Sequence, residues 1–272
     1  MKVLNLAIVA LLTTILAGGA TAFAEEARKV TTEGQIIFTP NADEESVVIP
    51  PENEPDVNID VEVPGTTGPL SIVKATTMNF GSQVISNQDQ TYNMVAEMQK
   101  LTNPTTDGPK EVPYVSFAQV QDTRGNNAGW DLKVSLSDFT STSQNNVLTG
   151  AKVSLLDPRI QYEGNTATNA PVGHASRLDL IPGAGAVPVM TAANQKGAGS
   201  SSVVWGNQED LTKQFADKDV DVVENKAIQL SIPGSTAKDA TTYTSTLSWE
   251  LTSTPTNTTP PVDPPVDPPA AP

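Results

Sequence analysis

The feature that most constrains the fold is a strict alternation of apolar and polar residues, which recurs from about residue 112 onward. In residues 130–136 (WDLKVSL) every even position is apolar and every odd position is polar. Because successive side chains of a strand point to opposite faces, this pattern predicts a strand with one buried face. The alternation also runs through residues 228–232 and 243–251, on either side of the turn-forming pair Pro233-Gly234. We expect these two segments to form a hairpin with a long loop.

Further strands are predicted between turn-forming clusters along the chain. They fall at residues 36–39, 70–74, 112–122, 152–156, 177–181 and 201–205. Helical periodicity is best developed in residues 91–101 and 208–215. The pattern therefore predicts an all-β chain, folded as a single β-sandwich-like domain of the immunoglobulin-like or Greek-key kind.

The N-terminus has the pattern of a secretory signal peptide. Lys2 precedes an apolar run over residues 3–16, and Ala22-Phe23-Ala24 provides a cleavage site of the Ala-x-Ala kind. Residues 1–24 are thus expected to be removed on secretion. Since no later apolar stretch approaches the length of a membrane helix, we expect no membrane span after cleavage.

The amino-acid composition excludes several kinds of binding site and partner. Cysteine is absent, so disulfides, thiolate metal sites and a lipoprotein anchor are excluded, and a secreted chain without disulfides points to a bacterium. The formal net charge of -15 repels phosphates, which argues against a nucleic-acid partner.

Two segments differ in composition from the rest. Residues 40–69 are dense in Pro, Asp and Glu, and residues 256–272 repeat a Pro-Pro-Val-Asp unit. Both segments are predicted to be extended, polyproline-like and weakly ordered, the first as a linker segment within the domain and the second as a disordered Pro-rich tail.

Residues 122–132 (DTRGNNAGWDL) and 243–255 (YTSTLSWELTSTP) resemble the proximal and distal motifs of the WxL family. Ser248 replaces the usual Thr of the distal motif. Three supporting segments also occur in family order, at residues 34–38, 68–72 and 79–81. The resemblance implies a WxL cell-wall-binding domain over residues 25–255.

The family resemblance implies secretion to the cell wall or surface of a Gram-positive bacterium and non-covalent binding to peptidoglycan or another wall glycan. It further implies partnership with other cell-surface proteins encoded alongside. The chain has no Leu-Pro-x-Thr-Gly sorting signal, which agrees with non-covalent attachment.

Six residues carry the motifs: Trp130, Leu132, Tyr243, Leu247, Trp249 and Leu251. As a binding surface, they would offer indole faces that stack on sugar rings. As core residues, they would affect wall binding only indirectly, by stabilising the domain. Their place within alternating strands favours the core role, and both interpretations remain open.

No catalytic, cofactor or metal site is predicted. Asp217, Asp219 and Asp221 have the spacing of a calcium loop, but Val222 and Ile228 stand where that loop requires Gly and Glu. His174 is the single histidine, and no Gly-x-Ser-x-Gly elbow accompanies it, so a loop role is expected.

We therefore predict a non-enzymatic protein that binds the wall and displays or scaffolds partner proteins. One alternative is an adhesin for host extracellular matrix. A second is a wall-active glycoside hydrolase, which is supported only by the abundance of acidic residues and not by any selected pair.

Overall fold

The computed structural model describes residues 33–40, 47–61, 64–164 and 166–253. The expected signal peptide and Pro-rich tail lie outside the described residues. The chain divides into two compact units, Met1–Ile37 and Phe38–Pro272, and every described helix and strand belongs to the second. Residues 33–40 are exposed and form no strand, so the strand prediction for residues 36–39 is wrong. Within the described ranges, no helix is long and apolar enough to cross a membrane.

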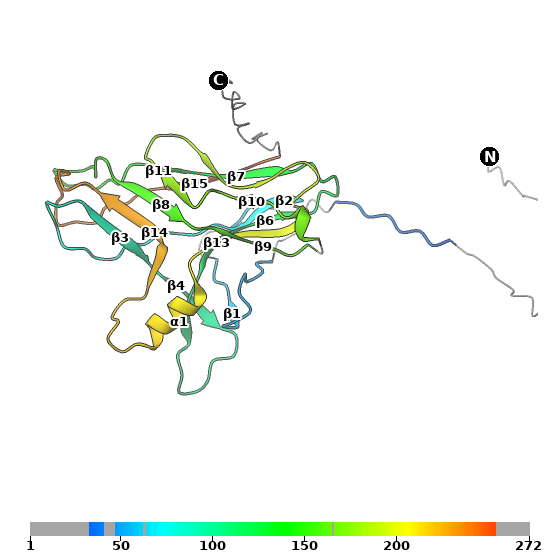
Figure 1. Cartoon of the computed structure of the whole chain (residues 1–272), viewed down its shortest axis with the longest axis horizontal. Coiled ribbons are helices and arrows are strands. Elements are labelled where there is room, and N and C mark those ends of the chain that lie inside the picture. The colour runs from blue at the N-terminus through cyan, green and yellow to red at the C-terminus, as the bar shows by residue number, and fades with distance from the viewer. Residues whose placement is uncertain (1–32, 41–46, 62–63, 165, 254–272) are drawn as a thin grey trace, which may run out of the picture. The chain divides into compact units, whose positions relative to one another are not determined.

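The described part of the chain is nearly all β, which confirms the predicted class (Figure 1). It contains one α-helix, α1 (Gln208–Ala216), and one 3-10 helix, η1 (Ala167–Asn169). The strands are β1 (Val57–Asn58), β2 (Leu70–Lys74), β3 (Gln90–Val95), β4 (Glu97–Leu101), β5 (Glu111–Tyr114), β6 (Ser116–Asp122), β7 (Trp130–Leu136), β8 (Lys152–Leu156), β9 (Arg159–Tyr162), β10 (Val172–Gly173), β11 (Arg177–Leu180), β12 (Val187–Ala192), β13 (Gly199–Trp205), β14 (Glu224–Ile232) and β15 (Leu247–Thr252).

The strands form four small antiparallel sheets, ordered β1-β4-β5, β10-β12-β7-β15, β11-β8-β14-β3 and β2-β6-β13-β9. The predicted single sandwich is therefore too simple, since this arrangement is closer to a four-blade, propeller-like one. The physical reason lies in two long extended segments that change sheet midway. Ala96 separates β3 from β4, Val115 separates β5 from β6, and each half pairs in a different sheet.

The predicted hairpin between residues 228–232 and 243–251 is wrong. β14 pairs with β3 and β8, whereas β15 pairs with β7. The connection between them crosses from one sheet to another, and both strands direct apolar side chains into one shared core. Alternation shows that a strand has a buried face, but it does not identify the strand beside it.

The two helical predictions had opposite outcomes. Residues 208–215 lie in α1, which begins after Asn207, whose side chain accepts a hydrogen bond from the Asp210 backbone N–H at 3.0 Å. Residues 91–101 instead lie in the strands β3 and β4 and in Ala96, which separates them. There Met94 and Ala96, two residues apart, are both buried, as in a strand with one inner face.

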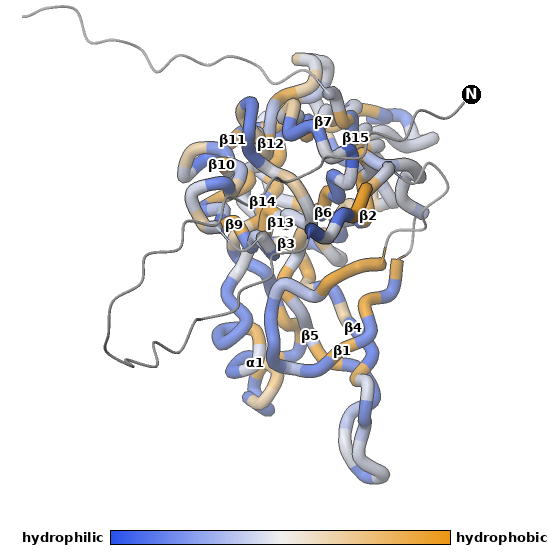
Figure 2. Tube along the Cα trace, turned by 90° about the vertical axis from the view of Figure 1, so that its right-hand side faces the viewer, coloured by the Kyte–Doolittle hydropathy of each residue, from blue (hydrophilic) through white to orange (hydrophobic). Residues whose placement is uncertain are grey.

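Two cores stabilise the described fold. The larger core is enclosed by three sheets and includes side chains such as Leu132 on β7, Val153 on β8 and Val203 on β13. The smaller core joins α1 to the sheet β1-β4-β5, and these elements lie together in Figure 2. Part of the acidic Pro-rich segment packs here, because Val57 is buried and the Glu52 carbonyl accepts a hydrogen bond from the Tyr114 hydroxyl at 2.9 Å.

Candidate functional site

The two motif strands lie side by side although more than a hundred residues separate them. β7 and β15 pair antiparallel, and the register places Leu251 opposite Leu132. Trp249 lies opposite Val134, and Leu247 lies opposite Leu136. The structure therefore brings the proximal and distal motifs together in one sheet, with β7 between β12 and β15.

Trp130 is fully buried, as is Leu132. The indole N–H of Trp130 donates a hydrogen bond to the Gly197 carbonyl at 3.0 Å, so its single polar group has a partner inside the core. Gly197 has a φ of +75°, and a Cβ at this position would lie 2.7 Å from the Trp130 Nε1 atom. The ring and the glycine backbone are thus closely fitted.

The distal motif residues are only partly buried. Leu247, Trp249 and Leu251 pack against the larger core from the edge strand β15. Tyr243 lies just before this strand, and its hydroxyl donates to the Asn145 carbonyl at 2.6 Å and accepts from the Asp239 N–H at 3.0 Å. Tyr243 therefore ties together two loops at the end of the motif sheet.

The polar part of the proximal motif holds the loop between β6 and β7. The Arg124 guanidinium donates to both carboxylate oxygens of Asp122, at 2.9 and 2.8 Å, and to the Gly129 carbonyl at 2.9 Å. The hydrogen bonds that Arg124 donates to the Asp122 carboxylate raise the pKa of Arg124. Since the Asp122 side chain is 2% exposed, this ion pair is buried and fixes the approach to Trp130.

Trp205 and His174 form part of this region, and sequence reasoning did not single out Trp205. Trp205 is fully buried, and its ring centroid lies 6.5 Å from that of Trp249. Its indole N–H donates to His174 Nε2 at 2.9 Å, while His174 Nδ1 donates to the Ala175 carbonyl at 2.6 Å. Burial lowers the pKa of His174, which favours the neutral ring that these two bonds require.

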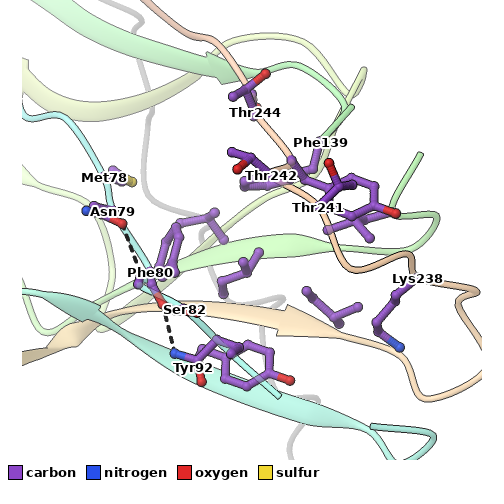
Figure 3. A pocket seen from close by; sticks show the side chains of 18 of the residues that line it. Met78, Asn79, Phe80, Ser82, Tyr92, Phe139, Lys238, Thr241, Thr242 and Thr244 are labelled. Atoms are coloured by element: carbon purple, nitrogen blue, oxygen red, sulfur yellow. Dashed lines mark hydrogen bonds between the residues drawn. The ribbon is translucent and has the colours of Figure 1, made fainter. Parts of the chain in front are cut away.

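A cleft of about 1090 Å³ opens beside the N-terminal end of β15. Its lining combines aliphatic side chains, four aromatic rings and a set of hydroxyl and amide groups (Figure 3). Tyr243 and Leu247 of the distal motif belong to this lining, whereas Trp130 and Trp249 do not. Sequence reasoning missed the cleft because its walls come from segments that are distant in the chain.

The acidic triplet of the sequence has a local structural role at Asp217. Asp217 caps the C-terminus of α1, and its carboxylate accepts a hydrogen bond from the Asp219 N–H at 3.0 Å. Across the described ranges, no group of three or more His, Cys, Asp or Glu side chains is arranged to bind a metal ion.

In a comparison with known protein families, residues 25–255 match a family described as "WxL domain surface cell wall-binding". Neither the curated proteins nor the solved structures gave a significant match to the chain. The matched range covers every sheet of the described fold and both motif strands.

Proposed function

The chain belongs to the WxL family of surface cell wall-binding domains, and on this premise we propose that it attaches non-covalently to the peptidoglycan of a Gram-positive cell wall. Attached in this way, it displays or scaffolds partner proteins at the surface. The family match over residues 25–255 carries the proposal, because it spans the whole folded domain rather than one short motif.

The environment of the motif residues supports a division of roles. Trp130 and Leu132 are fully enclosed, so we assign them to holding the β7-β15 sheet in place. A side chain without exposed surface cannot stack on a sugar ring. Contact with the wall is assigned instead to the accessible groups near Tyr243 and Leu247, which border the cleft.

The proposed attachment is non-catalytic. His174, the single histidine, uses both ring nitrogens in hydrogen bonds to Trp205 and Ala175. A histidine held in this way supports packing of Trp205 rather than proton transfer to a ligand.

Co-sedimentation tests the proposed attachment. The secreted chain, residues 25–272, is mixed with purified insoluble peptidoglycan, and an unrelated acidic protein of similar charge serves as the control. We expect the chain to sediment with the wall and to be released by denaturant or high salt without a wall hydrolase. Release from whole cells only after muralytic digestion would show covalent attachment instead.

A further inference from the structure

The cleft beside β15 lies between the sheet that carries both motifs and the sheet that contains β14. Leu136 and Leu247 come from the sheet that carries both motifs, whereas Leu230 and Ile232 come from β14 in the other sheet. Segments 78–85 and 238–245 complete its walls. Its volume of about 1090 Å³ is slightly above the usual range for small-ligand sites, which suits a short oligomer better than a single small molecule.

Flat aromatic surfaces are concentrated in this cleft. Aromatic residues make up only 5% of the chain, yet Phe80, Tyr92, Phe139 and Tyr243 all line it. Tyr92 and Tyr243 are partly exposed, whereas Phe80 and Phe139 are buried. Figure 3 shows Phe80, Tyr92 and Phe139 around the hollow. Aromatic faces next to aliphatic side chains accept the C–H faces of pyranose rings and the methyl group of an acetamide.

The rim of the cleft carries uncharged hydrogen-bonding groups. The exposed rim side chains include hydroxyls and amides, contributed by Asn79, Ser82, Gln83, Thr241, Thr242 and Thr244, together with the apolar side chains of Val84 and Ile85. A hydroxyl both donates and accepts hydrogen bonds, and a primary amide does the same with separate atoms. Such groups match the hydroxyls and acetamides of an N-acetylated sugar.

The two charged groups of the lining are already engaged by the protein. The Lys238 ammonium donates to the carbonyls of Ser86, Pro233 and Thr236 at 3.1, 3.2 and 2.9 Å. The Asp239 carboxylate accepts from the backbone N–H and the side-chain amide of Asn145 at 2.8 and 2.7 Å. Because an ammonium has three donors, Lys238 has none left for an anionic ligand.

From this chemistry we propose that the cleft binds the glycan strand of the wall, through its neutral N-acetylated hexosamine units. The ring faces and acetamide methyl groups contact the partly exposed rings of Tyr92 and Tyr243 and the exposed side chains of Val84 and Ile85, and the sugar hydroxyls bond to the hydroxyls and amides of the rim. The net charge of -15 and the engaged Lys238 act against phosphate polymers and carboxylate-bearing peptides. This inference rests on the proposed wall attachment and gives that attachment a site.

A blocking variant and a matched control test the site. Thr242→Trp places a large ring on the exposed rim, whereas Thr246→Trp makes the same change at an exposed position of the same segment outside the cleft lining. The probe is N,N′,N″,N‴-tetraacetylchitotetraose, and cellotetraose, which lacks the acetamides, is the ligand control. Calorimetry or NMR titration measures binding, and thermal unfolding checks that both variants fold.

We expect the wild-type chain and Thr246→Trp to bind the acetylated tetramer, and Thr242→Trp to lose at least tenfold in affinity with an unchanged melting temperature. Wall sedimentation should weaken in Thr242→Trp alone. Sedimentation of the wild type without binding of the tetramer, or with no effect of Thr242→Trp, would overturn the glycan site but leave wall attachment standing. Equal binding of cellotetraose would overturn recognition of the acetamide. Failure of the wild type to sediment would instead overturn the proposed function itself.

Discussion

Trp130 and Trp249 differ in environment although each begins a Trp-x-Leu sequence. Trp130 is fully enclosed and hydrogen-bonded to Gly197, while Trp249 is half-buried on the edge strand against Trp205. Removing an enclosed indole leaves a cavity in a close-packed core, whereas an edge position can partly relax or take up water. The two tryptophans should therefore respond differently to truncation.

Trp130→Ala is expected to lower the free energy of unfolding by about 3 to 5 kcal/mol, as for other buried aromatic residues. Trp249→Ala should cost less, because part of its ring already faces solvent. Denaturant unfolding of both variants measures the difference. If Trp130→Ala abolished wall binding while thermal unfolding stayed unchanged, Trp130 would be a ligand contact and its assignment to the core would be wrong.

Gly197 is predicted to be as sensitive as the ring it contacts. Gly197 and Gly183 have nearly the same φ, +75° and +74°. Gly197→Ala places a Cβ against Trp130, whereas Gly183→Ala, the control, places it in open space. Both substitutions carry the left-handed backbone cost of about 1 to 2 kcal/mol. Only Gly197→Ala adds crowding of about 1 to 3 kcal/mol. Equal unfolding midpoints for the two variants would show that the fit to Trp130 does not matter.

At the scale of elements, the loop between β6 and β7 positions the proximal motif through a buried ion pair. Arg124 is 13% exposed and Asp122 is 2% exposed, so neither charge has much access to water. An exposed pair of similar length, Lys100 with Asp60, offers a contrast, with side chains 62% and 60% exposed. Ion pairs at exposed positions contribute little to stability, because water already solvates both charges.

Arg124→Ala should destabilise the fold by about 3 kcal/mol, because it leaves the Asp122 carboxylate buried without its cation. Lys100→Ala, as the control, should leave the unfolding midpoint nearly unchanged. Chemical denaturation at neutral pH gives both values. A midpoint for Arg124→Ala that matched the control would mean that water or another group replaces the guanidinium.

For the molecule as a whole, the burial of His174 is expected to make stability depend on pH. Its folded pKa lies below the unfolded value of 6.5, since burial disfavours the charged ring. The unfolded chain therefore binds more protons between these two pKa values, so stability falls as pH falls through this range and is fully present above it. A protonated ring would also turn a second N–H toward the Trp205 indole N–H.

The melting temperature is expected to fall as the pH is lowered below 6.5, before free carboxylates become mostly protonated. Hydrogen bonds from Asn145 lower the pKa of Asp239 below 3.8, so its contribution is lost only at more acidic pH. His174→Gln should flatten the pH dependence in this window. A pH profile identical in the wild type and His174→Gln would show that His174 does not titrate with unfolding.

Local patterns in the sequence determined the class and much of the local structure. Alternation over residues 130–136 predicted β7 with its buried face, and the periodicity of residues 208–215 predicted α1, because side-chain direction follows from backbone geometry alone. The family motifs likewise identified a wall-binding domain before any contact was known. Whether the six motif residues contact the wall directly or act only by stabilising the domain stays a prediction.

Only the tertiary structure decided which strands are neighbours. Long-range contacts determine the pairing of β7 with β15 and the change of sheet at Ala96 and Val115. They also determine that residues 91–101 form strands rather than a helix. The Trp205–His174 bond and the cleft arise in the same way, from segments that meet only when the sheets pack. A strand's alternation is fixed by its own backbone, but its partner is fixed by the free energy of burying that face against the rest of the chain.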